Sequence, residues 1–277
     1  MMQMSFRVPR RSLRRVPILL IAVLLAGGCA TPITRGTSFA RDNGFEREIV
    51  TGVGFRHVVW RKPGPPSDSV LHIYLEGDGT PHTSPRTVAR DPTPREPVML
   101  HLMALDPHAS VYVGRPCYWG LYADTGCAPY LWTLGRFSAP VVESIVAVIV
   151  REMVARPGAH VVIYGHSGGA TLALLAVDRG LRPAGIVTLG GNLDPDAWTA
   201  LHGYTPLAGS LNPVGEPLTG SALRLRHYVG DRDTNTPPAL VRSAALRIGG
   251  EVIVIPGFDH HCCWSQIWAE AAGFAGE

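Results

Sequence analysis

The stretch Gly165-His166-Ser167-Gly168-Gly169 decides the fold of this chain. It follows the apolar run Val161–Tyr164 and opens a second apolar stretch, residues 170–177, that has the composition of a helix. This order predicts a buried strand, a sharp turn and a helix, with a serine at the apex of the turn. Such a turn strains the backbone of its apex residue and lifts that side chain clear of the sheet. The neighbouring glycines supply the room that the turn needs.

A serine at this position needs a base to remove its proton, and the base needs an acid to orient it. The expected chain order is serine, then acid, then histidine. Downstream of Ser167, a predicted strand over residues 223–229 leads into a loop that contains Asp233. A predicted helix over residues 239–248 and a further strand over residues 251–255 follow, and the loop after that strand contains His260. The sequence therefore presents the three groups in the required order.

These segments together resemble the α/β-hydrolase superfamily. Residues 165–169 resemble its nucleophile elbow, Gly230-x-x-Asp233 resembles its acid loop, and Gly257-x-x-His260 resembles its histidine loop. The resemblance runs from about residue 45 to the C-terminus and implies Ser167 as nucleophile, Asp233 as acid and His260 as base. It also implies an α/β fold with a mostly parallel central sheet, flanking helices and a loop-rich lid insertion.

Other residues compete for the roles of acid and base. Asp231 lies two positions before Asp233, and some superfamily members place the acid after the preceding strand, which here would be Asp194 or Asp196. His261 neighbours His260, and His166 lies inside the elbow. The spacing from the preceding glycine favours Asp233 and His260. His261 is then a loop residue, and His166 is a packing or hydrogen-bonding residue.

An oxyanion hole requires two backbone N–H groups that point to the developing negative charge. Gly168, directly after the nucleophile, is predicted to supply one of them. The other is expected from the loop Glu76-Gly77-Asp78-Gly79, which follows the predicted strand 70–75. Many superfamily members carry His-Gly here, so Glu76 is a departure from the pattern. By position Asp78 is the expected donor, with Gly77 and Gly79 as alternatives. The Glu76 and Asp78 carboxylates are interpreted as hydrogen-bonding groups of the loop, and no metal site or cofactor is predicted.

The N-terminus has the pattern of an export signal. Residues 1–15 contain five arginines and no acidic residue, and residues 16–26 form an apolar core that is short for a membrane span. Gly27-Gly28-Cys29 resembles the bacterial lipobox, which implies cleavage after residue 28 and a lipid on Cys29. Ala30, rather than Asp, follows the cysteine and points to the outer membrane. We therefore predict an exported lipoprotein that faces the periplasm or the cell surface.

Removing the signal changes the charge of the protein. The whole chain has a formal net charge of +3, and losing five arginines leaves about −2. With this charge, the sequence gives no basic patch that would favour a nucleic acid as partner. We predict a signal peptide over residues 1–28, a polar linker over 29–43, and a single domain over 44–277 that includes a lid-like insertion at 194–220.

The cysteines agree with an oxidising compartment. Besides Cys29, the chain has Cys117, Cys127, Cys262 and Cys263. Cys117 and Cys127 flank one loop and are predicted to form a local disulfide. Cys262 and Cys263 are adjacent, so they would pair with each other, remain reduced, or reach the Cys117 loop. Zinc binding by these two cysteines and the neighbouring histidines lacks the usual ligand spacing.

These observations predict a serine hydrolase that cleaves a small-molecule or lipid ester, or a related acyl bond, through an acyl-enzyme. The membrane would be its partner through the lipid on Cys29. A peptidase or an acyltransferase would use the same three residues. From another class, an idle envelope lipoprotein that keeps the fold without the activity is the alternative.

Overall fold

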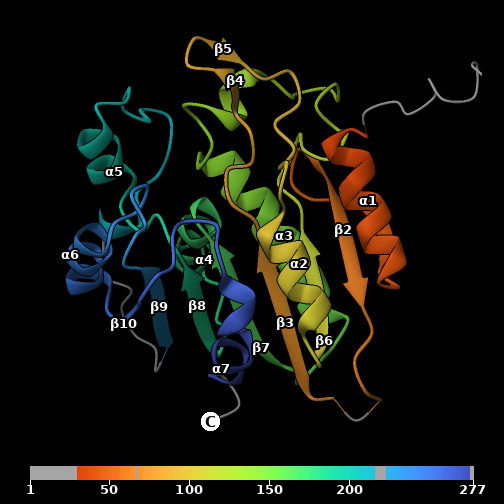
Figure 1. Ribbon diagram of the computed structural model, residues 1–277. Helices are drawn as coiled ribbons and strands as arrows, with labels where there is room; N and C mark the ends of the chain where they lie inside the picture. The colour runs from red at the N-terminus through yellow and green to blue at the C-terminus, as the bar shows by residue number, and fades with distance from the viewer. Residues whose placement is uncertain (1–29, 67, 216–222, 275–277) are drawn as a thin grey trace, which may run out of the picture. The chain divides into compact units, whose positions relative to one another are not determined.

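An eight-stranded sheet forms the centre of the computed structural model, which describes residues 30–66, 68–215 and 223–274 (Figure 1). The strand order is β1-β2-β6-β3-β7-β8-β9-β10. β2 is antiparallel to β1 and to β6, and all other neighbouring strands are parallel. The mostly parallel sheet predicted from the sequence is therefore confirmed. The strands are β1 (Glu46–Thr51), β2 (Arg56–Lys62), β3 (Val70–Leu75), β6 (Ala109–Val113), β7 (His160–His166), β8 (Gly185–Leu189), β9 (Arg224–Gly230) and β10 (Glu251–Ile255).

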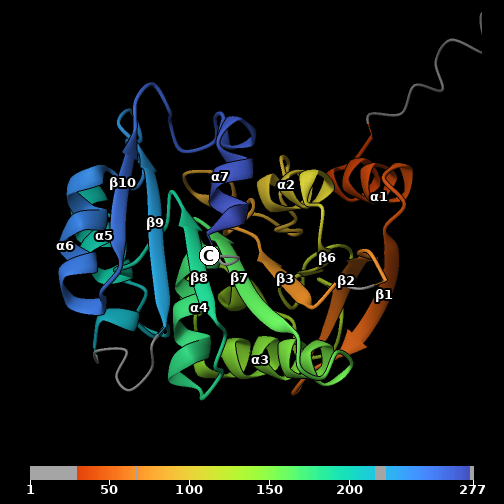
Figure 2. The same ribbon diagram turned by 90° about the horizontal axis from the view of Figure 1, so that it is seen from below.

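Helices cover both faces of this sheet (Figure 2). One face packs against α1 (Pro32–Asp42), α2 (Val98–Leu105) and α7 (Trp268–Gly273). The other packs against α3 (Ala139–Val154), α4 (Gly168–Asp178) and α6 (Pro238–Ile248). The remaining elements are the hairpin of β4 (His82–Ser84) and β5 (Thr87–Val88), helix α5 (Pro195–His202), and the 3₁₀ turns Pro129–Trp132, Pro213–Gly215 and Trp264–Gln266.

The two faces of the sheet carry different side chains. Along β3, Leu71, Ile73 and Leu75 point to the α3–α4 face, while Tyr74 points to the α2–α7 face. This alternation is the period of two that a strand imposes on its side chains. The α2–α7 face is rich in aromatic rings, among them Tyr164, which stacks on Tyr74 with ring centroids 5.3 Å apart. Burial on both faces explains why these strands read as nearly continuous apolar runs.

The predicted linker at residues 29–43 contains a helix. Pro32–Asp42 forms α1, in which Gly36 and Ala40 are buried. A Cβ on Gly36 would collide with the Trp119 ring, so the helix backbone lies directly against that ring. The Phe39 ring meets the His101 ring of α2 edge-on, at 4.5 Å between centroids. The prediction was wrong because this polar segment buries only a narrow stripe, which composition does not reveal.

The lid-like insertion at residues 194–220 also contains a helix, α5, and its residues 216–220 lie outside the described part of the chain. The Asp194 side chain accepts a hydrogen bond from the Ala197 N–H at 3.1 Å, so it caps α5 at its first turn. Pro195 is the first helical residue, and Gly203, with φ of 64°, ends the helix. An N-cap Asp, a Pro at the first position and a terminal Gly are the usual sequence signals of a helix.

The predicted export signal and Cys29 lie outside the described residues, since the structure describes the chain from residue 30 onward. Among the described residues, no helix has the length and apolar character that crossing a membrane requires.

Candidate active site

Ser167 occupies the sharp turn between β7 and α4, as the sequence predicts. Its φ of 51° and ψ of −122° place it in a region that non-glycine residues rarely adopt. The backbone folds back so tightly that a Cβ on Gly165 would lie 2.7 Å from the Ala170 nitrogen. A Cβ on Gly169 would collide with the carbonyl of Leu75 in β3. The glycines are therefore required by packing, and the turn leaves Ser167 partly exposed.

The predicted base and acid lie beside Ser167. The Ser167 hydroxyl is 3.0 Å from His260 Nε2, and His260 Nδ1 is 2.8 Å from Asp233 Oδ2. The three residues follow the carboxyl ends of β7, β10 and β9 respectively. Parallel strands bring their carboxyl ends to one edge of the sheet, which is how residues separated by 93 positions come into hydrogen-bond range.

The Asp233 carboxylate is held by further donors. Its Oδ1 accepts hydrogen bonds from the backbone N–H groups of Asn235, at 2.9 Å, and Thr236, at 2.8 Å. The Thr236 hydroxyl lies 2.9 Å from Asp233 Oδ2. Burial alone would raise the pKa of Asp233, but the hydrogen bonds from His260 and Thr236 outweigh burial and lower it. The carboxylate therefore stays ionised beside the imidazole.

The competing acids lie in other positions. Asp231 is exposed, and its Oδ1 accepts the Gly257 N–H at 2.7 Å, which ties two loops together. Asp194 caps α5, and Asp196 accepts a hydrogen bond from Asn212 Nδ2 at 2.8 Å. These three carboxylates have other partners, whereas Asp233 lies 2.8 Å from His260 Nδ1.

The competing histidines, His166 and His261, lie beside His260, and it is His260 whose ring is hydrogen-bonded to Ser167. The His261 ring is exposed, with its centroid 5.1 Å from that of His260. His166 is buried, and its Nε2 donates to the His260 carbonyl at 2.9 Å. Burial and the neighbouring His260 lower the pKa of His166 to about 3, so its ring is neutral at physiological pH. His166 therefore acts as a hydrogen-bonding group that positions the histidine loop.

The loop predicted to hold the oxyanion lies against Ser167. A Cβ on Gly77 would be only 3.2 Å from the Ser167 Cβ, and a Cβ on Gly168 would collide with the Asp78 carboxylate. The Gly77 N–H donates to the carboxyl group of Glu76 at 3.2 Å, so this N–H is already engaged. Tyr118 donates its hydroxyl to the Asp78 carbonyl at 2.8 Å, which fixes the peptide plane that follows Asp78.

Glu76 is a buried carboxyl group at the base of this loop. It accepts hydrogen bonds from the N–H groups of Gly77 and Met99, at 3.2 and 3.1 Å, and so anchors the start of α2. Burial raises the pKa of Glu76 to about 7 despite these bonds. The interpretation that Glu76 hydrogen-bonds the loop agrees with these contacts.

Asp78 joins two arginines that the sequence did not reveal as partners. Its carboxylate oxygens lie 2.8 Å from Arg115 Nη2 and 2.6 Å from Arg136 Nη1. The side chains of Arg115 and Arg136 are only 3% and 9% exposed. Burial opposes ionisation of Asp78, but Arg136 and Arg115 outweigh it and lower the pKa of the carboxyl group. This cluster holds the loop of residues 76–79 beside Ser167.

We expect Asp78→Asn to lower the free energy of unfolding by about 3 to 5 kcal/mol at pH 7, because it leaves two buried guanidinium groups without their counter-charge. Urea denaturation measures the loss. Since the pKa of Asp78 is depressed in the folded state, its stabilisation is complete above the unfolded-state pKa and is lost as pH falls through the folded-state pKa. The difference between wild type and variant should therefore shrink below about pH 4.

Asp124→Asn is the matched control for Asp78→Asn. Asp124 forms an equally short pair with Arg56, at 2.6 Å, but the arginine is 50% exposed. Such a surface pair contributes about 0 to 1 kcal/mol. An equal loss from the two substitutions would contradict a special role for the buried cluster.

A second serine–histidine pair lies elsewhere in the molecule. His57 Nε2 is 2.7 Å from the Ser144 hydroxyl, and both residues are fully buried. Its other ring nitrogen contacts the Gly114 carbonyl at 2.8 Å rather than a carboxylate. Burial lowers the pKa of His57 to about 4. This pair has neither access to a substrate nor an orienting acid, so it joins β2 to α3 structurally.

Cys117 and Cys127 form the disulfide that the sequence predicts, with their Cα atoms 5.6 Å apart. Cys262 and Cys263 are bonded to each other, which is one of the three states that the sequence left open. Within residues 30–66, 68–215 and 223–274, no group of three or more His, Cys, Asp or Glu side chains is arranged to hold a metal ion.

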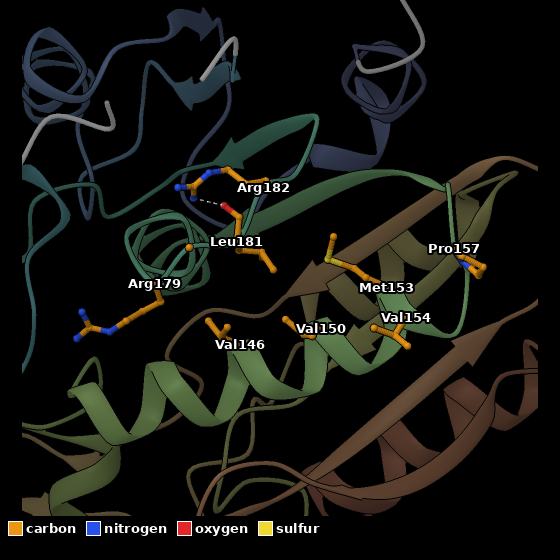
Figure 3. Close-up of a pocket in the computed structure, with 9 residues that line it drawn as sticks. Val146, Val150, Met153, Val154, Pro157, Arg179, Leu181 and Arg182 are labelled. Atoms are coloured by element: carbon orange, nitrogen blue, oxygen red, sulfur yellow. Dashed lines mark hydrogen bonds between the residues drawn. The ribbon is translucent and has the colours of Figure 1, made fainter. Parts of the chain in front are cut away.

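A groove of about 580 Å³ lies away from this site (Figure 3). It is lined by Val146, Val150, Met153, Val154, Pro157, Arg179, Gly180, Leu181 and Arg182. These residues belong to α3, to the loop that follows it (Pro157) and to the segment after the C-terminal end of α4, whereas Ser167 precedes the N-terminal end of α4. The groove is therefore separate from the Ser167 site.

Comparison with solved structures identifies the architecture. An esterase of Pyrococcus furiosus superposes with a TM-score of 0.57 at 14% identity, covering 85% of this chain and 92% of its own. The protein TT1662 of Thermus thermophilus gives 0.56 at 18%, covering 84% and 97%. An α/β serine hydrolase homologue from Coxiella burnetii gives 0.53 at 17%, covering 83% and 95%.

Protein-family models and curated protein sequences give no match to this chain. The identities to the solved structures are low, so the likeness concerns the fold. The strand order, the helices on both faces and these three structures agree, and the chain therefore has the α/β-hydrolase fold.

Proposed function

We propose that this protein is a serine hydrolase that cleaves carboxylic esters or related acyl bonds. The observation that carries the proposal is the chain of hydrogen bonds from Ser167 through His260 to Asp233, at 3.0 and 2.8 Å. A serine held at the apex of a strained turn, next to an imidazole oriented by a buried carboxylate, is the arrangement that makes a hydroxyl nucleophilic. An esterase and a serine hydrolase homologue share the fold, which is compatible with this chemistry.

In the proposed reaction, the Ser167 oxygen attacks the carbonyl carbon of the ester while His260 Nε2 takes the hydroxyl proton. Asp233 stabilises the imidazolium that forms. The backbone N–H groups of Gly168 and Asp78 are the proposed donors to the oxyanion, since the Gly77 N–H is engaged by Glu76. His260 then returns the proton to the alcohol oxygen as the ester C–O bond breaks. In the second half, a water that gives a proton to His260 attacks the carbonyl carbon of the acyl-enzyme. His260 passes this proton to the Ser167 oxygen as the carboxylic acid leaves.

A fluorophosphonate probe tests the proposal on the mature chain. We expect it to label the peptide that contains Ser167 and not the peptide that contains Ser144, although both serines contact a histidine. Hydrolysis of p-nitrophenyl esters of increasing chain length, beside a peptide p-nitroanilide, then separates esterase from peptidase. Absence of both labelling and turnover would favour the idle envelope lipoprotein instead.

We propose further that Cys29 carries a lipid and that the protein is anchored in the outer membrane. The basic segment, the short apolar core and Gly27-Gly28-Cys29 support this proposal. Because α1 begins at Pro32, only Ala30 and Thr31 separate Cys29 from the first helix. The anchor would hold the enzyme where lipids and envelope esters are abundant.

We expect Cys29→Ser to move the protein from the membrane to the soluble fraction, with turnover of a soluble ester unchanged. An acyl chain contributes about 0.8 kcal/mol per buried methylene, so its loss removes the anchor. Membrane fractionation and mass spectrometry of the N-terminus measure this, and Thr31→Ser is the control. An unmodified wild-type chain, or one that retains residues 1–28, would contradict the lipoprotein proposal.

A further inference from the structure

Asn235 connects the acid, the base and the lid-like helix α5. Its backbone N–H donates to Asp233 Oδ1, and its side-chain nitrogen lies 2.9 Å from His260 Nε2. Its side-chain oxygen lies 3.2 Å from Trp198 Nε1, and its carbonyl lies 2.8 Å from His202 Nε2. Trp198 and His202 both belong to α5. One half-buried residue therefore contacts three separate parts of the molecule.

The contact with Trp198 determines how the Asn235 amide is turned. An indole N–H only donates, so the amide oxygen must face Trp198 and the amide nitrogen must face His260. Because an amide nitrogen also only donates, His260 Nε2 must be the acceptor. His260 Nδ1 then carries the proton and donates a hydrogen bond to Asp233 Oδ2. Trp198 thus helps to select the neutral tautomer through Asn235.

The contact between the Asn235 amide and His260 Nε2 opposes proton uptake by His260. Nε2 has a single lone pair, and two donors approach it: the Ser167 hydroxyl at 3.0 Å and the Asn235 amide at 2.9 Å. Once Nε2 binds the serine proton, it becomes a donor that faces the Asn235 N–H. Turning the amide over would place its oxygen on the imidazolium, but its nitrogen would then face the Trp198 N–H.

We propose that Asn235 is a positioning residue that sets the proton affinity of His260, and that Trp198 of α5 holds its amide in the orientation that opposes protonation. Displacement of α5 would release the amide and make His260 a stronger base. This inference rests on the proposed function of Ser167 and His260. It assigns to the lid-like helix an effect on the reaction through a hydrogen bond rather than through covering the site.

Several other groups also face His260. Asp233 follows β9, and Asp78, paired with Arg115 and Arg136, lies on the loop after β3. His166 ends β7, and Asp259 and His261 flank His260 on its own loop. Among the described residues, the Asn235 amide has Trp198 and His260 as its hydrogen-bond partners, so a change of that amide alters one interaction of His260 and leaves these charges in place.

The test is the pH dependence of kcat/KM for a soluble p-nitrophenyl ester. We expect Asn235→Ala to move the acid limb of the profile to higher pH by about 0.5 to 1 unit, as the loss of one hydrogen bond to the neutral imidazole requires. Trp198→Phe keeps an aromatic ring next to Arg136 but removes the N–H. It should shift the limb in the same direction, because the amide is then free to turn.

His202→Ala is the matched control. It removes the contact of α5 with the Asn235 carbonyl and an edge contact with the Trp198 ring, but it keeps the Trp198 N–H that orients the amide, so the acid limb should stay in place. An unmoved limb in both Asn235→Ala and Trp198→Phe, or an equal shift in His202→Ala, would overturn the inference. If Asn235→Ala does not fold, Trp198→Phe alone decides between these outcomes.

Fluorophosphonate labelling separates this inference from the proposed function. If the wild type is not labelled at Ser167, the proposed function fails and the inference with it. If the wild type and both variants are labelled at alkaline pH but share one pH profile, only the inference fails.

Discussion

Ser167→Ala should lower ester hydrolysis by a factor on the order of 10⁶, because removing the nucleophile of such a group removes most of its rate enhancement. The fold should survive, since the Ser167 side chain is partly exposed and its hydroxyl contacts only site residues. Alanine also meets the same backbone strain at φ of 51° as serine does. Steady-state turnover, with urea denaturation as the check on folding, measures the two effects.

Ser144→Ala is the control for this experiment. Ser144 is also hydrogen-bonded to a histidine, His57, but this pair lies inside the core. Its loss should cost about 1 kcal/mol of stability and leave turnover unchanged. Turnover of Ser167→Ala at the wild-type rate would refute Ser167 as nucleophile.

Asp233→Asn should lower turnover by about 10⁴-fold, as replacing the acid by an amide does in a well-studied triad. The structure explains why the amide would be harmful here. Two backbone N–H groups point to Oδ1, so the amide oxygen would occupy that position and the amide nitrogen would face His260 Nδ1. His260 would then carry its proton on Nε2, where it is unable to accept the proton of Ser167.

Asp231→Asn and His261→Ala are the controls for the acid and the base. Asp231 accepts a hydrogen bond from the Gly257 N–H, and His261 lies exposed beside His260. Both variants should therefore retain most of the wild-type activity. His260→Ala should match Ser167→Ala in its effect on turnover. Greater damage from Asp231→Asn than from Asp233→Asn would move the acid to Asp231, and the same comparison applies to the two histidines.

The sequence predicted those parts of the site whose geometry is determined within one short segment. The strand, glycines and helix around Ser167 specify a strained turn, because only small neighbours fit between β7, α4 and the β3 carbonyls. The loops of Asp233 and His260 were expected from their resemblance to those of α/β-hydrolases, and the structure places His260 beside Ser167 and Asp233 beside His260. Helix α5 had clear sequence signals at Asp194, Pro195 and Gly203, which a reading of the segment as loop-rich overlooked.

By itself, then, the sequence determined the mostly parallel α/β architecture and the order of Ser167, Asp233 and His260, because apolar period and turn chemistry act between neighbours in the chain. Only the tertiary structure decided that Asp78 pairs with Arg115 and Arg136, that α1 packs on Trp119, and that Trp198 orients Asn235. Each of these contacts joins residues that are 37 to 83 positions apart in the chain. Their partners are selected by the packing of the whole sheet, and no local pattern encodes that choice.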